Sequence, residues 1–256
     1  MLTNRISIIA ILALIVLLNS CAKEGPTGPI GPAGPNYYGT IAGHVSLYDQ
    51  YGSRVFTGLD SATLTLVGQT VPTTVVTSTD ANGYYNITNV PSGSYNLTTS
   101  RPNYATTMKS NFSFFDGTLT EDVKLSAIPD SFLNSFTIIH SPGSLFDSLV
   151  TSVTANPYPR SCIVFVNNNS AVSSNEYVGY TLNYVQAIPP NSTTVYIPVS
   201  RNDLTNAGFI SGSTLVYYAA YSYVVNDFSV YEDQASGKKV YNAVNATALI
   251  DSAIVP

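Results

Sequence analysis

The chain has 256 residues, of which only 10% are charged, with 10 Lys and Arg against 15 Asp and Glu. Globular domains contain about 25% charged residues, so this chain is unusually poor in charge, while its 45% of hydrophobic residues exclude a disordered protein. The net charge of -5 excludes a basic nucleic-acid-binding surface, and two His leave little material for acid–base or metal chemistry. We therefore expect no cofactor, no nucleic-acid partner and no enzymatic activity.

Residues 1–20 have the form of a secretory signal peptide. Arg5 supplies the positive charge, and the apolar run at 6–18 is shorter than the roughly 20 residues of a spanning helix. The sequence Leu-Leu-Asn-Ser-Cys at 17–21 resembles the lipobox of bacterial lipoproteins. This resemblance implies that Cys21 is acylated and contacts the membrane through its lipid. It also implies a location at the outer membrane, on the periplasmic or the cell-surface side.

Residues 21–37 are predicted to be a spacer that follows the lipidated cysteine. Glycine occupies every third position from Gly25 to Gly34, and prolines alternate with it in a collagen-like pattern. These few repeats are too short to hold a triple helix unaided, although trimer formation stays an alternative. A Pro-rich segment favours polyproline II, so we expect a semi-rigid stalk.

Residues 38–128 show the alternation of apolar and polar residues that is typical of β-strands, broken by frequent turns. The turns come in an ordered series: Gly43-x-Val45, Asp49-x-x-Gly52, Thr79-Asp80-x-x-Gly83-x-Tyr85-x-Ile87, Val90-Pro91-x-Gly93-x-Tyr95-x-Leu97 and Asn103-Tyr104. This series resembles the carboxypeptidase regulatory-like domain. The resemblance implies a transthyretin-like β-sandwich without an active site of its own, in a family found on secreted enzymes, surface proteins and outer-membrane receptors.

Residues 129–256 contain a second set of strand patterns, with a single helical turn expected at 200–206. The strand candidates are 136–140, 163–167, 177–186, 194–200, 215–225, 228–233 and 238–244. Their number suits an immunoglobulin-like sandwich, by pattern only. The predicted fold class is therefore all-β, with two β-sandwich domains behind a Gly/Pro stalk.

Few residues suggest chemistry. Asp80-Ala81-Asn82-Gly83 matches a fragment of a Ca²⁺ loop, but the downstream bidentate Glu is missing, so we expect a hairpin turn and no metal. His44 and His140 lie in different units without a Ser/His/Asp pattern and are expected to face solvent. Cys162 lies in an apolar run and is expected to be a small buried side chain.

The tyrosines are the most suggestive feature of the sequence. Tyr217, Tyr221 and Tyr223 alternate on one strand and should share a face, and Tyr180 and Tyr184 repeat the spacing on another strand. These five residues are the candidate ligand-binding positions, because tyrosine can stack on sugar rings or contact a protein partner. Alternatively, tyrosine simply forms strands well and covers a sandwich surface.

The sequence therefore predicts a non-catalytic, membrane-anchored lipoprotein that serves as a protein-interaction, adhesion or envelope-assembly module. The alternative is a surface lipoprotein that binds carbohydrate on its Tyr-rich strand face. Its partner would be an envelope or surface protein, or a glycan. Three Asp-Ser-aliphatic sequences, at Ser61, Ser148 and Ser252, are similar to bacterial O-glycosylation sites and are candidate positions of modification.

Overall fold

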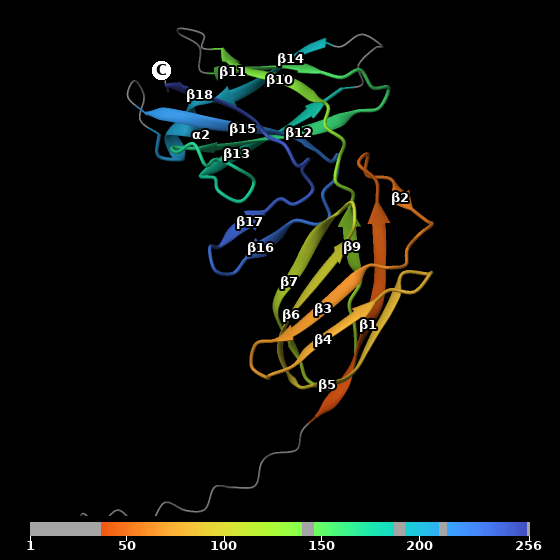
Figure 1. Cartoon of the computed structure of the whole chain (residues 1–256). Coiled ribbons are helices and arrows are strands. Elements are labelled where there is room, and N and C mark those ends of the chain that lie inside the picture. The colour runs from red at the N-terminus through yellow and green to blue at the C-terminus, as the bar shows by residue number, and fades with distance from the viewer. Residues whose placement is uncertain (1–36, 140–145, 187–192, 210–213, 255–256) are drawn as a thin grey trace, which may run out of the picture. The chain divides into compact units, whose positions relative to one another are not determined.

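The computed structural model describes residues 37–139, 146–186, 193–209 and 214–254 (Figure 1). The signal peptide, Cys21, the Gly/Pro spacer and His140 lie outside these residues. The regular secondary structure of the described residues is almost entirely strand, which confirms the all-β prediction. Among them, no helix is long and apolar enough to cross a membrane.

Two sheets form the N-terminal sandwich. In the first, β1 (Tyr38–Tyr48) lies between β2 (Arg54–Val55) and β5 (Tyr84–Pro91), and β8 (Gly117–Thr120) and β9 (Val123–Ser126) pair with β1 in parallel. The second sheet has the order β4-β3-β6-β7, with β3 at Thr63–Gly68, β4 at Thr74–Ser78, β6 at Gly93–Arg101 and β7 at Tyr104–Phe114. Alternate apolar side chains such as Ile41, Leu64 and Leu97 fill the core between the two sheets.

Two further sheets hold the second core. One has the order β10-β11-β14, with β10 at Leu133–Ile139, β11 at Phe146–Val153 and β14 at Thr193–Ser200. The other has the order β13-β12-β15-β18, with β12 at Arg160–Asn167, β13 at Gly179–Val185, β15 at Leu215–Tyr223 and β18 at Leu249–Ile254. Side chains such as Leu149, Val164 and Val216 are fully buried in the core that these strands share. The expected helical turn is present as α2 (Arg201–Asn206).

The second set of strands agrees with the sequence pattern in type but not in every position. β11 and β18 are strands that the pattern did not predict, and the strand expected at 228–233 is shortened to β16 (Tyr231–Asp233), which forms a hairpin with β17 (Lys238–Val240). The β10-β11-β14 sheet and the β13-β12-β15-β18 sheet form a second sandwich. The contacts between residues group 36–256 as one compact unit and do not separate the two sandwiches. The boundary at residues 128 and 129 therefore stays a prediction.

Candidate functional site

The candidate tyrosines share one face of the β13-β12-β15-β18 sheet. Tyr180 lies opposite Phe165, Tyr184 opposite Ser161, and Ser161 in turn opposite Tyr223. Tyr221 lies opposite Ile163, and Tyr217 opposite Asn167. Since directly paired residues project to the same side of a sheet, all five tyrosines project to one side, as the two-residue period predicts.

The structure nevertheless divides the five tyrosines into buried and exposed members. Tyr221 and Tyr223 are only 8% and 4% exposed, and Tyr217 is half-buried. Tyr180 and Tyr184 are 43% and 54% exposed. A ligand could therefore touch Tyr180 and Tyr184 directly, whereas Tyr221 and Tyr223 would act only as support. The candidate ligand-binding surface is therefore limited to the exposed tyrosines of β13, Tyr180 and Tyr184.

The buried tyrosines belong to a cluster of aromatic rings. We define this aromatic cluster as Phe165, Tyr177, Tyr180, Tyr221, Tyr223 and Tyr241. The Phe165 ring is central, with centroids 5.0 Å from Tyr177, 5.7 Å from Tyr221 and 5.8 Å from Tyr241. Tyr180 joins the cluster through Tyr241, at 4.9 Å. Tyr177 and Tyr241 lie outside the central strands and could not be assigned to this face from strand periodicity.

Hydrogen bonds fix the phenols of this cluster. The Tyr177 hydroxyl donates to the Lys239 carbonyl at 2.7 Å, and the Tyr223 hydroxyl donates to Asp227 Oδ2 at 2.9 Å. Burial raises the pKa of Tyr221 and of Tyr223, and the nearby Asp227 carboxylate raises that of Tyr223 further. Both phenols therefore stay protonated at neutral pH, and the Tyr223 hydroxyl serves as a hydrogen-bond donor to Asp227.

The exposed part of the face is a row of three side chains on β13. Tyr180, Leu182 and Tyr184 occupy alternate positions, and Leu182 is 55% exposed. We call these three residues the β13 row. β13 ends its sheet and pairs only with β12 among the described strands. The row therefore lies along an edge whose outer backbone groups no described strand engages.

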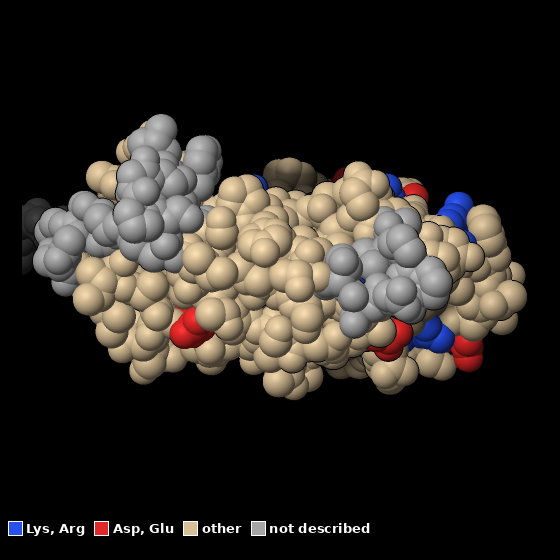
Figure 2. All heavy atoms as spheres, turned by 90° about the horizontal axis from the view of Figure 1, so that it is seen from above, with Lys and Arg blue, Asp and Glu red and all other residues tan. Residues whose placement is uncertain are grey.

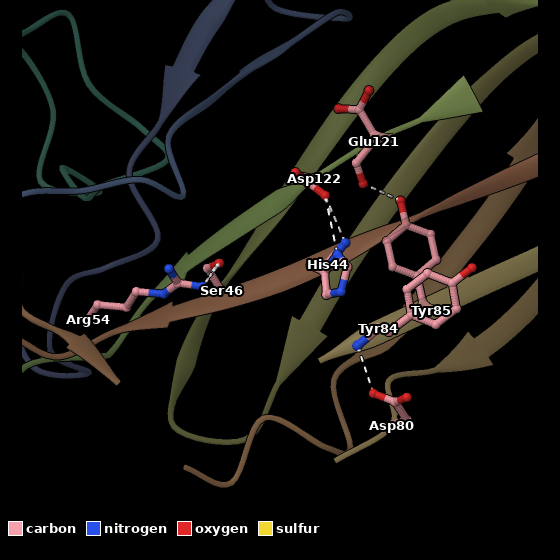
Figure 3. Close-up of polar contacts among 8 residues, drawn as sticks. All are labelled: His44, Ser46, Arg54, Asp80, Tyr84, Tyr85, Glu121 and Asp122. Atoms are coloured by element: carbon pink, nitrogen blue, oxygen red, sulfur yellow. Dashed lines mark hydrogen bonds and ion pairs between the residues drawn. The ribbon is translucent and has the colours of Figure 1, made fainter. Parts of the chain in front are cut away.

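A separate polar cluster lies around His44 on β1 (Figure 3). The His44 backbone N–H donates to Asp122 Oδ1 at 2.9 Å, and the imidazole Nδ1 lies 3.9 Å from the same oxygen. The Tyr85 hydroxyl donates to the Glu121 carbonyl at 2.6 Å. A Cβ at Gly43 would lie 2.1 Å from the Glu121 carbonyl oxygen, so the chain passes closely over β1 here. These contacts fasten the segment between β8 and β9.

The His44 side chain is exposed, as expected from the sequence. It contacts the Asp122 carboxylate and the Tyr84 ring, whose centroid is 5.3 Å away. Within the described ranges, no contact joins it to a hydroxyl or thiol that could act as a nucleophile, and no group of three or more His, Cys, Asp or Glu could hold a metal ion. The contacts of His44 with Asp122 hold β1 next to the segment between β8 and β9.

The Asp80–Gly83 segment forms the expected hairpin turn. Asp80 Oδ1 accepts the backbone N–H groups of Asn82 and Tyr84, each at 2.9 Å, and Gly83 has a φ of +78°. The Asp80 carboxylate is thus used by the turn itself. Its residues fit a hairpin better than a Ca²⁺ loop.

Asp227, which accepts the hydrogen bond of the Tyr223 hydroxyl, makes the stability of the fold depend on pH. Burial raises the pKa of Asp227 above its ordinary value, against the opposing effect of the Ser229 backbone N–H, which donates to Oδ1 at 2.7 Å. A carboxyl with a raised pKa binds its proton more readily in the folded state than in the unfolded chain. Its contribution to stability is therefore greatest below the ordinary Asp pKa of about 3.9 and declines as the pH rises toward the raised value.

We expect Asp227→Asn to remove this decline, so that the urea midpoint of the variant falls less between pH 4 and neutral pH than that of the parent chain. Asp233→Asn is the matched control, because the Ser236 hydroxyl lowers the pKa of the exposed Asp233 carboxyl and gives the opposite sign. Urea denaturation at a series of pH values measures both. Parallel pH profiles for the parent and Asp227→Asn would contradict the assignment.

Residues 48–126 match the family model of the carboxypeptidase regulatory-like domain, which confirms the resemblance carried by the turn series. A candidate carbohydrate-binding protein from Bacteroides uniformis is 15% identical, with 87% of this chain and 100% of that chain covered and a TM-score of 0.31. A DUF3823 family protein from Parabacteroides merdae is 14% identical, with 84% and 100% covered and a TM-score of 0.27.

The major pilin subunit BcpA of Bacillus cereus is 13% identical, with 85% of each chain covered and a TM-score of 0.31. No curated protein matches the chain.

Proposed function

We propose that this chain is a non-catalytic surface lipoprotein, anchored through Cys21, that binds a protein partner along β13. The partner would present an extended segment with apolar side chains at alternate positions. One observation carries the proposal: the β13 row places three large apolar side chains, each more than 40% exposed, on an edge strand. An added strand would gain main-chain hydrogen bonds from the edge and side-chain contacts from the row.

The composition of β13 supports binding at this edge. Proteins usually protect exposed edge strands with charged residues or proline, because an unprotected edge pairs with other chains. Gly179–Val185 contains neither a charged residue nor a proline. The described edge strands β4 and β10 also lack charge and proline, but each has one large exposed hydrophobic side chain, Val76 and Ile139 respectively. β13 is thus the described edge that combines open backbone groups with a continuous apolar row.

The support beneath the row favours a preorganised surface. Tyr180 is held against the aromatic cluster, and the neighbouring strand β12 is buried at Ile163 and Phe165. A partner would therefore order few side chains of this protein on binding, which lowers the entropic cost of association. Figure 2 shows few charged side chains on the face that it draws, in keeping with the 10% of charged residues in the chain.

Site-specific photo-crosslinking in cells tests the proposal. A photoreactive phenylalanine at position 184 should form a discrete adduct with a partner protein, and Leu182→Lys should abolish it, because a lysine protects the edge. Tyr196, 66% exposed on β14, is the matched control position and should not give the same adduct. An identical adduct from position 196, or one that persists with Leu182→Lys, would rule out β13 as the binding edge.

Carbohydrate binding is the second candidate function, because Tyr180 and Tyr184 are exposed aromatic residues whose Cα positions lie about 13 Å apart along one strand. Such rings can stack on sugar units of one glycan chain. A glycan array probed with and without calcium tests this alternative. Reproducible binding that Tyr184→Ala abolishes would establish carbohydrate capture on this row in place of a protein partner.

A further inference from the structure

The edge strand β13 has nearly the same side chains when it is read in either direction. From 180 to 184 its sequence is Tyr-Thr-Leu-Asn-Tyr. Leu182 lies at the centre, with the exposed Tyr180 and Tyr184 two positions away on either side and the half-buried polar Thr181 and Asn183 between them. A strand with this symmetry can pair in antiparallel fashion with a second copy of itself, about a two-fold axis at Leu182.

The two-fold axis fixes the register of such a pair. Leu182 lies opposite Leu182 of the second copy, and Tyr180 of each copy lies opposite Tyr184 of the other. Residues directly opposite each other in antiparallel strands project to the same face, with Cβ atoms about 4.5–5.5 Å apart. The two β13 rows therefore lie side by side, and every large apolar side chain of one row meets a large apolar side chain of the other. Aromatic cross-strand pairs of this kind stabilise strand pairing.

The absence of charge on β13 permits the same pairing. A charged residue at the centre of a two-fold contact meets the same charge in the second copy, and like charges directly opposite each other are destabilising. Gly179–Val185 contains no charged residue, so no such repulsion arises along the strand. On the half-buried side, Asn183 Nδ2 donates to Thr181 Oγ1 at 3.3 Å within one chain. These two side chains lie opposite each other across the two-fold axis and keep a donor and an acceptor there.

Two other described edges are less suited to this contact. β18, the opposite edge of the same sheet, also exposes two large side chains, Ile250 and Ile254. However, Asp251 of β18 accepts the Ile138 N–H of β10 at 3.1 Å, so β10 lies against that edge. β4 exposes a single large hydrophobic side chain, Val76, and offers little apolar surface to a second copy.

We propose that two copies of this chain pair through β13 and join their β13-β12-β15-β18 sheets into one continuous sheet. This inference rests on the proposed function, because it names the partner that β13 binds. Each copy supplies the extended segment with alternate apolar side chains that the edge of the other copy requires. A two-fold contact uses the β13 edge of both copies, so it closes as a dimer and does not continue into a fibre.

Disulfide formation from a single substitution tests the pairing. Leu182→Cys in the full-length chain places one cysteine opposite the other, with Cα atoms about 4.5–5.5 Å apart, which a disulfide spans. After mild oxidation of membranes from expressing cells, most of this variant should migrate at twice the monomer mass and return to the monomer on reduction. Tyr196→Cys, at an exposed position on β14, is the matched control and should stay monomeric. The native Cys162 is 0% exposed and does not interfere.

Two further variants test the register. Tyr180→Cys places its cysteine opposite residue 184 of the second copy, and about 13 Å from residue 180 of that copy. Tyr180→Cys and Tyr184→Cys should therefore each stay monomeric when expressed alone. When chains that carry one or the other substitution are expressed together, they should form a mixed disulfide.

The outcomes separate this inference from the proposed function. A monomeric Leu182→Cys, or as much disulfide dimer from Tyr196→Cys, would overturn the pairing of two copies. If a photoreactive residue at position 184 then formed an adduct with a different protein, binding along β13 would stand and only the identity of the partner would be wrong. An adduct with a second copy of this chain would support both. The absence of any adduct at position 184 would contradict the proposed function itself.

Discussion

Replacing Phe165 with Ala is expected to lower the free energy of unfolding by about 3–5 kcal/mol, which is the usual cost of truncating a fully buried Phe. Phe165 is 0% exposed on the central strand β12, and its ring lies within 6.3 Å of four tyrosine rings. The substitution therefore removes both buried apolar area and several aromatic contacts. Since whole proteins are stable by about 5–15 kcal/mol, urea or thermal unfolding should show a marked loss.

Two further variants test whether the loss of stability comes from the buried position and the aromatic contacts of Phe165. Phe165→Leu keeps much of the buried volume and loses the aromatic contacts, so its loss of stability should be smaller than that of Phe165→Ala. Leu182→Ala removes an exposed side chain from the adjacent strand and should change stability by less than about 1 kcal/mol. If Phe165→Ala unfolded at the same urea concentration as Leu182→Ala, the aromatic cluster would not be the support that the structure indicates.

Local patterns were sufficient to predict the hairpin turn at Asp80–Gly83 and the shared side of the candidate tyrosines. The hairpin at Asp80–Gly83 follows from an Asp that accepts backbone N–H groups and a Gly that adopts positive φ. Pairing between distant segments was not predictable in the same way. β1 pairs in parallel with both β8 and β9, which lie far along the chain, and no local pattern specifies such a partner. β11 and β18 were missed although both are strands of the second core.

The candidate tyrosine face shows the same limit. A period of two correctly places Tyr221 and Tyr223 on one side of β15, but it does not say what covers that side. The cover includes Tyr177 and Tyr241, which the chain brings from distant positions onto Phe165.

Replacing Cys21 with Ser is expected to abolish labelling by palmitate analogues and to deplete the protein from the membrane fraction. One acyl chain gives only marginal membrane binding, with an association constant of about 10⁴ M⁻¹, whereas two or three chains anchor a protein stably. Without the acyl chains, the apolar run at 6–18 would remain, and it is shorter than a spanning helix. Metabolic labelling followed by membrane fractionation measures both effects.

Cys162→Ala provides the matched control, because Cys162 is the other cysteine of the chain. Its side chain is 0% exposed, and burial raises the pKa of its thiol to about 12, so it is a poor nucleophile and an inaccessible acylation site. This variant should therefore keep full palmitate labelling and membrane association. Label that persists in Cys21→Ser, or disappears in Cys162→Ala, would show that the anchor is not at Cys21, and the surface location would lose its physical basis.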